Sequence, residues 1–288
     1  MADISASTVM KLRKMTGQGM MDCKRALQEA NGDVDSAVDI LRKKGLVTLA
    51  KRAGRETTEG LVVSGSSEDG KTVVLATLCC ETDFVAKSDA FIAAAEKLVQ
   101  CGLVCAVSEG VENILSTEID GKSFKDVLVE TVSKTGEKTE VGDYSRYSVD
   151  GSGMIRVYIH FNKKVGTMVQ IETSNDDTAG SEVVKKTAAD IAMHITAIKP
   201  LGLDRDCIDA ETVAKEKAIY AEQVKGKPES IIEKIVEGKL KKFFGENCLL
   251  DQAFVKDDSK TVSQVLAEAA KEAGGEARIT KFVRFEVG

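Results

Sequence analysis

The spacing of apolar residues changes near residue 56, and this change constrains the fold more than any other feature of the chain. Before it, apolar residues recur every three or four positions, which is typical of helices with one buried face. After it, short runs of alternating β-branched residues predict strands. The chain is therefore expected to be an α+β protein whose antiparallel sheets are built from strands joined by short turns.

The first 45 residues predict a bundle of three short helices. Residues that end helices divide this segment twice: Thr16-Gly17-Gln18-Gly19 follows the first apolar stripe, and Asn31-Gly32 follows the second. We expect the third helix to begin after Asp33 and to stop at Gly45, with a charged linker beyond it.

Two methionines begin the second predicted helix. Met20 fits the apolar stripe and is expected in the bundle core, whereas Met21 lies off the stripe. Because methionine side chains adapt their shape to a partner helix, Met21 is a candidate contact residue.

A strand hairpin followed by a helix occurs twice, at 59–101 and at 153–198. Each copy combines two apolar strands with one amphipathic helix, and we interpret the copies as two α+β units of related build. The changes in pattern predict three domains, at 1–55, 56–150 and 151–288.

The third domain contains an inserted antiparallel helical hairpin at 209–245. Helical patterns cover 211–225 and 229–244, and Gly226-Lys227-Pro228 turns the chain between them. The second helix carries more apolar residues than one partner helix can cover, namely Ile231, Ile232, Ile235, Val236, Leu240 and Phe243. We therefore expect part of this hairpin to contact another subunit or protein.

Composition favours a binding protein over an enzyme. The chain has two histidines, no tryptophan and seven cysteines without a CxxC pair, so we expect reduced thiols, no metal, no cofactor, no catalytic residues and a cytoplasmic location. The net charge of −6 argues against direct DNA or RNA binding. No apolar run approaches the ~20 residues of a membrane span, so we expect no membrane contact.

One segment matches a phosphate-binding loop by its letters alone: Gly65-x4-Gly70-Lys71-Thr72. That loop needs a helix directly after its Lys-Thr pair, whereas Val73-Val74-Leu75 predicts a strand. Glu68 and Asp69 would also repel phosphates. We interpret the segment as the turn of a strand hairpin and expect no nucleotide site in this chain.

An apolar pair interrupts a predicted strand-to-helix corner, where turn residues are normally polar. Phe84 and Val85 either fill the core or project into a pocket of a partner. The residues alone favour the inward position. An enzyme that uses Asp83 together with a distant carboxylate is an alternative, but nothing in the sequence positions a second carboxylate.

Several stretches together resemble the translation elongation factor Ts family. The matching stretches are 12–27, Cys80-x-Thr82-Asp83-Phe84-Val85-Ala86-Lys87, Ala192-Met193-His194-Ile195 with Lys199-Pro200, Glu237-Gly238-Lys239 and Arg284-Phe285-Glu286-Val287. They lie in the family's order and cover nearly the whole chain, so the resemblance is specific. Thr77 and Cys79 depart from the pattern, since many members carry Glu and Asn there.

The resemblance implies a guanine nucleotide exchange factor that binds GDP-bound elongation factor Tu, disturbs its Mg²⁺ and phosphate site and promotes GDP release. It also implies a ubiquitin-associated-like N-terminal bundle, two core subdomains and a helical hairpin that forms a homodimer or a two-plus-two complex. The alternative is an interaction scaffold that uses the ubiquitin-associated-like bundle and has no exchange activity.

The resemblance further implies three groups of partner-binding residues. They are Thr82, Asp83, Phe84 and Val85 at the corner, Arg13, Met20, Met21 and Lys24 in the N-terminal domain, and His194, Phe254 and Val255 in the last domain. Taken alone, His194 lies on the flank of its helix, where a polar side chain with satisfied hydrogen bonds is the ordinary interpretation.

Overall fold

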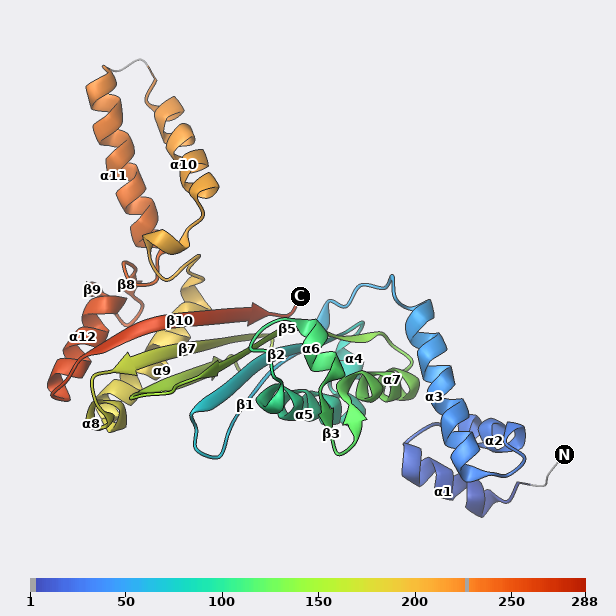
Figure 1. Ribbon diagram of the computed structural model, residues 1–288. Helices are drawn as coiled ribbons and strands as arrows, with labels where there is room; N and C mark the ends of the chain where they lie inside the picture. The colour runs from blue at the N-terminus through green and yellow to red at the C-terminus, as the bar shows by residue number, and fades with distance from the viewer. Residues whose placement is uncertain (1–3, 226–227) are drawn as a thin grey trace.

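The computed structural model describes residues 4–225 and 228–288 (Figure 1). The α+β prediction is confirmed, because helices and antiparallel sheets occupy separate blocks of the chain. In Figure 1 a small helical bundle lies at one end, two sheets lie at the centre, and a helical hairpin projects beyond them. The predicted turn residues Gly226 and Lys227 lie outside the described residues.

The N-terminal bundle has the three predicted helices, α1 (Ala6–Thr16), α2 (Met20–Glu29) and α3 (Val34–Lys51). Gly17 ends α1 in the left-handed conformation, with φ of 68°, and its N–H donates to the carbonyl of Arg13 at 2.7 Å. The small core of the bundle is formed by Val9, Leu12, Cys23, Ala26, Leu27, Ala37 and Leu41.

The prediction that Gly45 stops the third helix is wrong, since α3 continues to Lys51. Gly45 instead marks the place where α3 crosses α7 (Phe124–Thr135). A Cβ at position 45 would lie 2.7 Å from the carbonyl oxygen of Val129 on α7. Only glycine permits this approach, so the residue serves packing between helices and the expected linker is helical as far as Lys51.

The prediction that Met20 belongs to the bundle core is also wrong. Its side chain is 43% exposed, and Met21 is 59% exposed. The buried residues of α2 begin at Cys23, so the first turn of the helix extends beyond the core.

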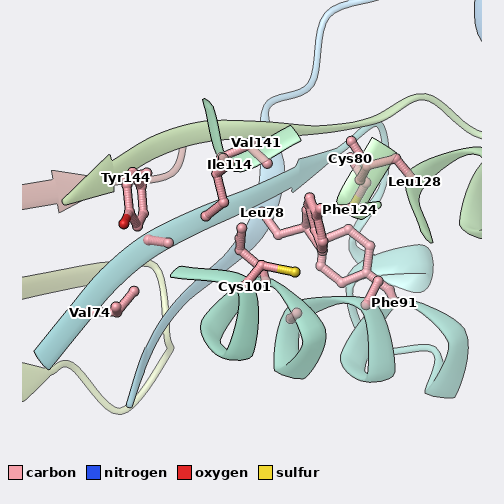
Figure 2. Packing of buried hydrophobic residues seen from close by; sticks show 14 of the residues in the cluster. Val74, Leu78, Cys80, Phe91, Cys101, Ile114, Phe124, Leu128, Val141 and Tyr144 are labelled. Atoms are coloured by element: carbon pink, nitrogen blue, oxygen red, sulfur yellow. The ribbon is translucent and has the colours of Figure 1, made fainter. Parts of the chain in front are cut away.

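The first α+β unit packs helices against one face of a three-stranded antiparallel sheet in the order β1-β2-β5. The strands are β1 (Glu59–Ser66), β2 (Thr72–Cys80) and β5 (Thr139–Ser148), and α5 (Asp89–Val104) and α7 cover them. Figure 2 shows the core between β2 and the helices, where Leu78 packs near Phe91 and Phe124. The remaining elements are α4 (Asp83–Ala86), α6 (Val111–Ser116), β3 (Glu118–Ile119) and β4 (Lys122–Ser123).

The second α+β unit repeats this plan with the strand order β10-β7-β6. Its strands are β6 (Gly153–Ile159), β7 (Val165–Thr173) and β10 (Ala277–Glu286), and its covering helices are α9 (Glu182–Ile198) and α12 (Val262–Glu272). The core contains Ile191 and Ile195 of α9 and Leu266 of α12. The smaller elements are α8 (Asp176–Gly180), β8 (Ala253–Phe254) and β9 (Asp257–Thr261).

The two sheets pack against each other through the faces that the helices leave uncovered. This interface contains Val62, Val73, Leu75, Tyr147 and Val149 from the first unit and Ile155, Met168 and Val287 from the second. Adjacent residues of a strand point to opposite faces, and Cys79 and Cys80 follow this rule. Cys80 lies in the core beneath α5, whereas Cys79 lies on the side of the other sheet.

The helical hairpin consists of α10 (Ala210–Gln223) and α11 (Glu229–Asn247), preceded by the short 3₁₀ helix η1 (Arg205–Cys207). Phe243 of α11 is buried at the root of the hairpin together with Ile208 and Cys248. Ile219 and Ile231 remain 50% and 44% exposed. The two helices therefore cover only part of their apolar surface, as predicted.

The segment that matches a phosphate-binding loop is the turn between β1 and β2. Thr72 begins a strand, and Val73 pairs with Ser66 of β1 and with Tyr147 of β5. Lys71 is exposed, and its N–H donates to Asp69 Oδ1 at 3.0 Å. The predicted strand hairpin is confirmed.

The packing between the sheets predicts that a side chain at position 166 lowers stability. A Cβ on Gly166 would lie 2.6 Å from Val62 Cγ1 and 3.3 Å from Leu75 Cδ1. We expect Gly166→Ala to lower the free energy of unfolding by about 1–3 kcal/mol, measured by urea denaturation. Gly151→Ala, which has open space around it, serves as the control. Equal loss of stability in both variants would contradict the tight contact between the sheets.

Candidate functional site

The corner between β2 and α5 presents an aromatic side chain to solvent. β2 ends at Cys80, and Thr82 caps the single-turn helix α4 by accepting a hydrogen bond from the N–H of Val85 at 3.4 Å. Phe84 is 82% exposed, whereas Val85 is only 9% exposed and belongs to the core of the first unit. Single exposed apolar residues are common, but an almost fully exposed phenylalanine on a capped corner is a candidate anchor for a partner.

The corner corrects the interpretation that the residues alone favoured. Successive residues of a helical turn point about 100° apart, so Phe84 and Val85 do not share one direction. Val85 takes the inward position and closes the core, and Phe84 takes the outward one. The inward interpretation is therefore right for Val85 and wrong for Phe84.

Asp83 is held as an ionised side chain. Lys87 Nζ donates to Asp83 Oδ2 at 2.7 Å, and this hydrogen bond lowers the pKa of Asp83 below its ordinary value. A general acid needs a pKa raised toward the working pH. The pairing of Asp83 therefore argues against a role as general acid.

Two further carboxylates accept backbone hydrogen bonds near the corner: Glu137 accepts from the Thr82 N–H, and Glu81 accepts from the Lys138 N–H. Partial burial raises the pKa of Glu81, but the Lys138 N–H and the Arg52 guanidinium lower it more, so the net pKa lies below its ordinary value. The charge of Glu81 therefore belongs to the structure of the corner, and the carboxylate of Glu137 is hydrogen-bonded to Thr82.

A groove of about 1010 Å³ lies beside the corner, between the first unit and the turn that joins β6 to β7. Asp83, Lys87 and Ile92 line one part of it, and Phe161 lines another. Phe161 is 88% exposed, so it is a second aromatic side chain available to a partner. The sequence interpretation missed it, although a phenylalanine directly before the polar turn Asn162-Lys163-Lys164 was a signal of the same kind as Phe84.

The predicted residues of the N-terminal domain all lie on its surface. Arg13, Met20, Met21 and Lys24 are exposed on α1 and α2. They are joined by residues that sequence reasoning did not single out: Met10, Lys11 and Lys14 line a hollow of about 700 Å³ together with Arg13 and Met20. Cations beside flexible thioethers suit an acidic, amphipathic partner segment.

The third predicted group is buried except for one residue. His194 is fully buried on α9, where Nδ1 accepts from the Val255 N–H at 3.2 Å and Nε2 pairs with Gln252 Oε1 at 2.9 Å. These partners assign the neutral Nε2–H tautomer to His194. The expectation of a polar side chain with satisfied hydrogen bonds is therefore confirmed. The side chain of His194 lies deeper in the protein than the flank of its helix. Phe254 stacks on the imidazole at 5.9 Å between ring centroids.

Of this group, only Val255 can touch a partner directly. It is 47% exposed, while Phe254 is 5% exposed. The hydrogen bond from its N–H to His194 fixes the backbone at this position, so His194 and Phe254 support the residue that faces solvent.

The structure does not gather the three groups into one pocket. They lie on three parts of the chain that have separate cores, namely the N-terminal bundle, the first unit and the second unit. Within residues 4–225 and 228–288, no three His, Cys, Asp or Glu side chains are placed to hold a metal ion. In the same described part of the chain, every helix is too short or too polar to cross a membrane.

Thr77, one of the departures from the family pattern, has a local structural role. It is 1% exposed, and its Oγ1 accepts from the Asp143 N–H at 2.6 Å where the register of β2 and β5 shifts. The Thr77 hydroxyl therefore satisfies a backbone N–H where the pairing of β2 with β5 is irregular, two residues before Cys79.

Known proteins match nearly the whole chain. A sequence model of the family described as Elongation factor TS matches residues 81–288. The elongation factor Ts of a Nitratiruptor species is 45% identical over 287 residues, which cover 99% of this chain and 93% of that protein. The elongation factor Ts of one Clostridium perfringens strain is 44% identical over 288 residues with the same coverage. The elongation factor Ts of Clostridium acetobutylicum is 44% identical over 289 residues, with 99% and 92% covered.

The buried histidine predicts that the protein loses stability in mild acid. Burial lowers the pKa of His194 below its ordinary value of 6.5, although the hydrogen bond with Gln252 raises it in part. Below that ordinary value the unfolded chain binds a proton that the folded chain does not bind. The stability present at higher pH is therefore lost as the pH falls from 6.5 toward the folded pKa.

We expect the free energy of unfolding to fall by up to about 1.4 kcal/mol per pH unit more steeply in wild type than in His194→Gln. Urea denaturation between about pH 7.5 and about pH 5.5, which brackets the ordinary pKa of histidine, measures this difference. Equal steepness in the two proteins would contradict a neutral, buried His194.

Proposed function

The chain belongs to the elongation factor Ts family, and on that premise we propose that it is the guanine nucleotide exchange factor of translation elongation. Its partner is the GTPase elongation factor Tu in its GDP-bound form. The protein binds this GTPase, promotes GDP release and allows GTP to replace it. It performs no bond chemistry of its own and works in the cytoplasm, where translation takes place.

The exposed ring of Phe84 is the single observation that carries this proposal. Phe84 is 82% exposed on a capped turn, beside a core residue of the same turn, and this exposure supports its insertion into another protein. We assign it the role of a wedge that enters the GTPase near the elements that support its Mg²⁺ and phosphate site. Thr82 and Val85 hold the turn, and Asp83 flanks the ring.

The free energy needed to displace the nucleotide exceeds what Phe84 alone can supply. Binding of the exchange factor and binding of nucleotide must weaken each other by the same factor. Shifting an equilibrium about 10⁴-fold takes ~5.5 kcal/mol, whereas burying one phenylalanine yields only ~1.5–3 kcal/mol. The remainder must come from other surfaces of the chain.

Two other surfaces are available for this purpose. Arg13, Met20, Met21 and Lys24 form an exposed N-terminal surface, and Val255 is exposed on the second unit above His194. We propose that the N-terminal surface and the corner bind the nucleotide-binding domain of the GTPase, while Val255 contacts another of its domains. The corresponding division of the chain is 1–55, 56–150 and 151–288.

We expect Phe84→Ala to slow GDP release from elongation factor Tu by roughly tenfold or more, because the wedge contact is lost. Release of a fluorescent GDP analogue, followed by stopped flow, measures the rate. The melting temperature should stay near that of wild type, since the ring packs against little of its own protein. Some acceleration should persist through the other two surfaces.

Val104→Ala is the matched control, because Val104 is 63% exposed at the end of α5 away from the corner and belongs to none of the surfaces assigned to a partner. It should release GDP as wild type does. A wild-type rate in Phe84→Ala would reject the wedge role.

We propose that the helical hairpin at 209–245 joins two copies of the chain, as a homodimer or within a two-plus-two complex with the GTPase. Ile219 and Ile231 supply exposed apolar surface on α10 and α11. The cores of the two α+β units contain no residue from these helices among those described. The hairpin can therefore serve association without affecting the folding of the sheets.

Replacing residues 210–244 by a short Gly-Ser linker between Asp209 and Gly245 should keep both units folded and lower the mass of the assembly. Light scattering measures the mass, and GDP release shows that the corner still functions. A wild-type protein that is monomeric alone and forms only a one-to-one complex would refute the dimer.

A further inference from the structure

The direction of the Phe84 ring depends on contacts that its neighbours make. Its side chain is 82% exposed and makes few contacts of its own. α4 has four residues, and a helix this short is not stable by itself. Contacts from outside α4 must therefore fix the corner.

Val85 and Ala86 anchor α4 in the core, and two carboxylates supply further contacts in a reciprocal arrangement. Glu137 Oε2 accepts from the Thr82 N–H at 3.0 Å, and its Oε1 accepts from the Thr82 hydroxyl at 2.8 Å. In the other direction, Glu81 Oε1 accepts from the Lys138 N–H at 2.7 Å. The pairs 81–82 and 137–138 thus hold each other, and we call this arrangement the carboxylate clamp.

Arg52 supplies the positive charge of the clamp. Its Nη1 donates to Glu81 Oε1 at 2.7 Å and to Oε2 at 2.8 Å. The side chain of Glu81 is only 16% exposed, so water screens this pair weakly. Removing the guanidinium would leave the shielded Glu81 carboxylate without its ion-pair partner, beside a second carboxylate in the same clamp.

The same arginine belongs to the N-terminal bundle. Arg52 is the C-cap residue that follows Lys51 at the end of α3, and its N–H donates to the Thr48 carbonyl at 3.1 Å. α3 packs against α1 and α2 at its beginning and reaches the corner at its end. The bundle and the Phe84 corner are therefore joined by one continuous helix and one ion pair.

We propose that Arg52 is a positioning residue for Phe84. Its two hydrogen bonds to Glu81 hold the carboxylate clamp together. The clamp in turn sets the direction of the Phe84 ring relative to the N-terminal surface that contains Met20 and Met21. The two surfaces then reach the partner in a fixed geometry. This inference rests on the proposed exchange function for its consequence, but the closure of the clamp can be measured without the partner.

The absence of tryptophan allows a direct probe of the corner. In a Phe84→Trp background, the only indole of the protein reports the order of this position through its fluorescence anisotropy decay. Arg52→Ala and Arg52→Lys are introduced into this background. Arg42→Ala is the matched control, because Arg42 also joins α3 to the first unit, through an ion pair with Asp126 on α7.

We expect Arg52→Ala to increase the amplitude of fast local motion at position 84 at least twofold, and Arg42→Ala to leave it as in the parent. Arg52→Lys should restore part of the order at position 84, because lysine keeps the positive charge but does not bind both carboxylate oxygens of Glu81 as the guanidinium does. In protein that retains phenylalanine at position 84, Arg52→Ala should slow GDP release about tenfold, while Arg42→Ala should change the rate less than twofold.

Equal anisotropy decays in the Arg52→Ala and Arg42→Ala proteins would overturn the proposal. If Arg52→Ala does not fold, the Arg52→Lys protein decides the question, and wild-type order at position 84 in that protein would equally overturn it. The wedge role of Phe84 and the carboxylate clamp can be refuted independently of each other. A wild-type exchange rate in Phe84→Ala refutes the wedge, whereas the anisotropy measurement tests the clamp in either case.

Discussion

The contact between the two sheets is the constraint on which the rest of the structure depends. Each sheet has three strands and a helical layer on one face, and neither unit could leave its other face, rich in Val, Ile and Leu, in water. Pressing the two bare faces together yields four layers, with helices outside and both sheets inside. Gly166 shows how close this approach is, since even a methyl group there would meet Val62.

This arrangement leaves the candidate binding residues at the edges of a rigid frame. The corner lies where β2 leaves the sheet, Val255 lies beside the strand β8, and the bundle is attached through α3 and α7. Val85 and Phe84 illustrate the division of roles. One residue of the turn is fixed in the core, and its neighbour is thereby presented to solvent in a defined direction.

Periodicity was sufficient to predict the α+β class, both strand hairpins, the three-helix bundle and the rejection of the phosphate loop. It failed where a tertiary contact outweighed a local signal. Gly45 is a helix breaker by propensity, but the crossing with α7 requires a residue without a side chain there, so α3 continues.

Sequence patterns singled out the residues of the candidate site, but they did not show which of these residues are exposed to solvent. Met20 lies on the apolar stripe yet extends beyond the core, and His194 lies deeper than its helical angle suggests because Gln252 and Val255 satisfy both of its nitrogens. Spacing along one helix carries no information about where the neighbouring layer ends. The link between Arg52 and Glu81 was equally invisible, since its members lie 29 residues apart.

The rigid connection between the bundle and the corner changes how two separate surfaces can act on one partner. Surfaces joined by a flexible linker bind nearly independently, and each contact costs its own ordering entropy. Surfaces joined by the continuous helix α3 and a shielded ion pair have lost that freedom already in the free protein. When one surface binds the partner, the other surface is held at a set distance from the first. A frame of this kind can force a partner to change shape, because the partner must adapt to a spacing that the frame does not relax.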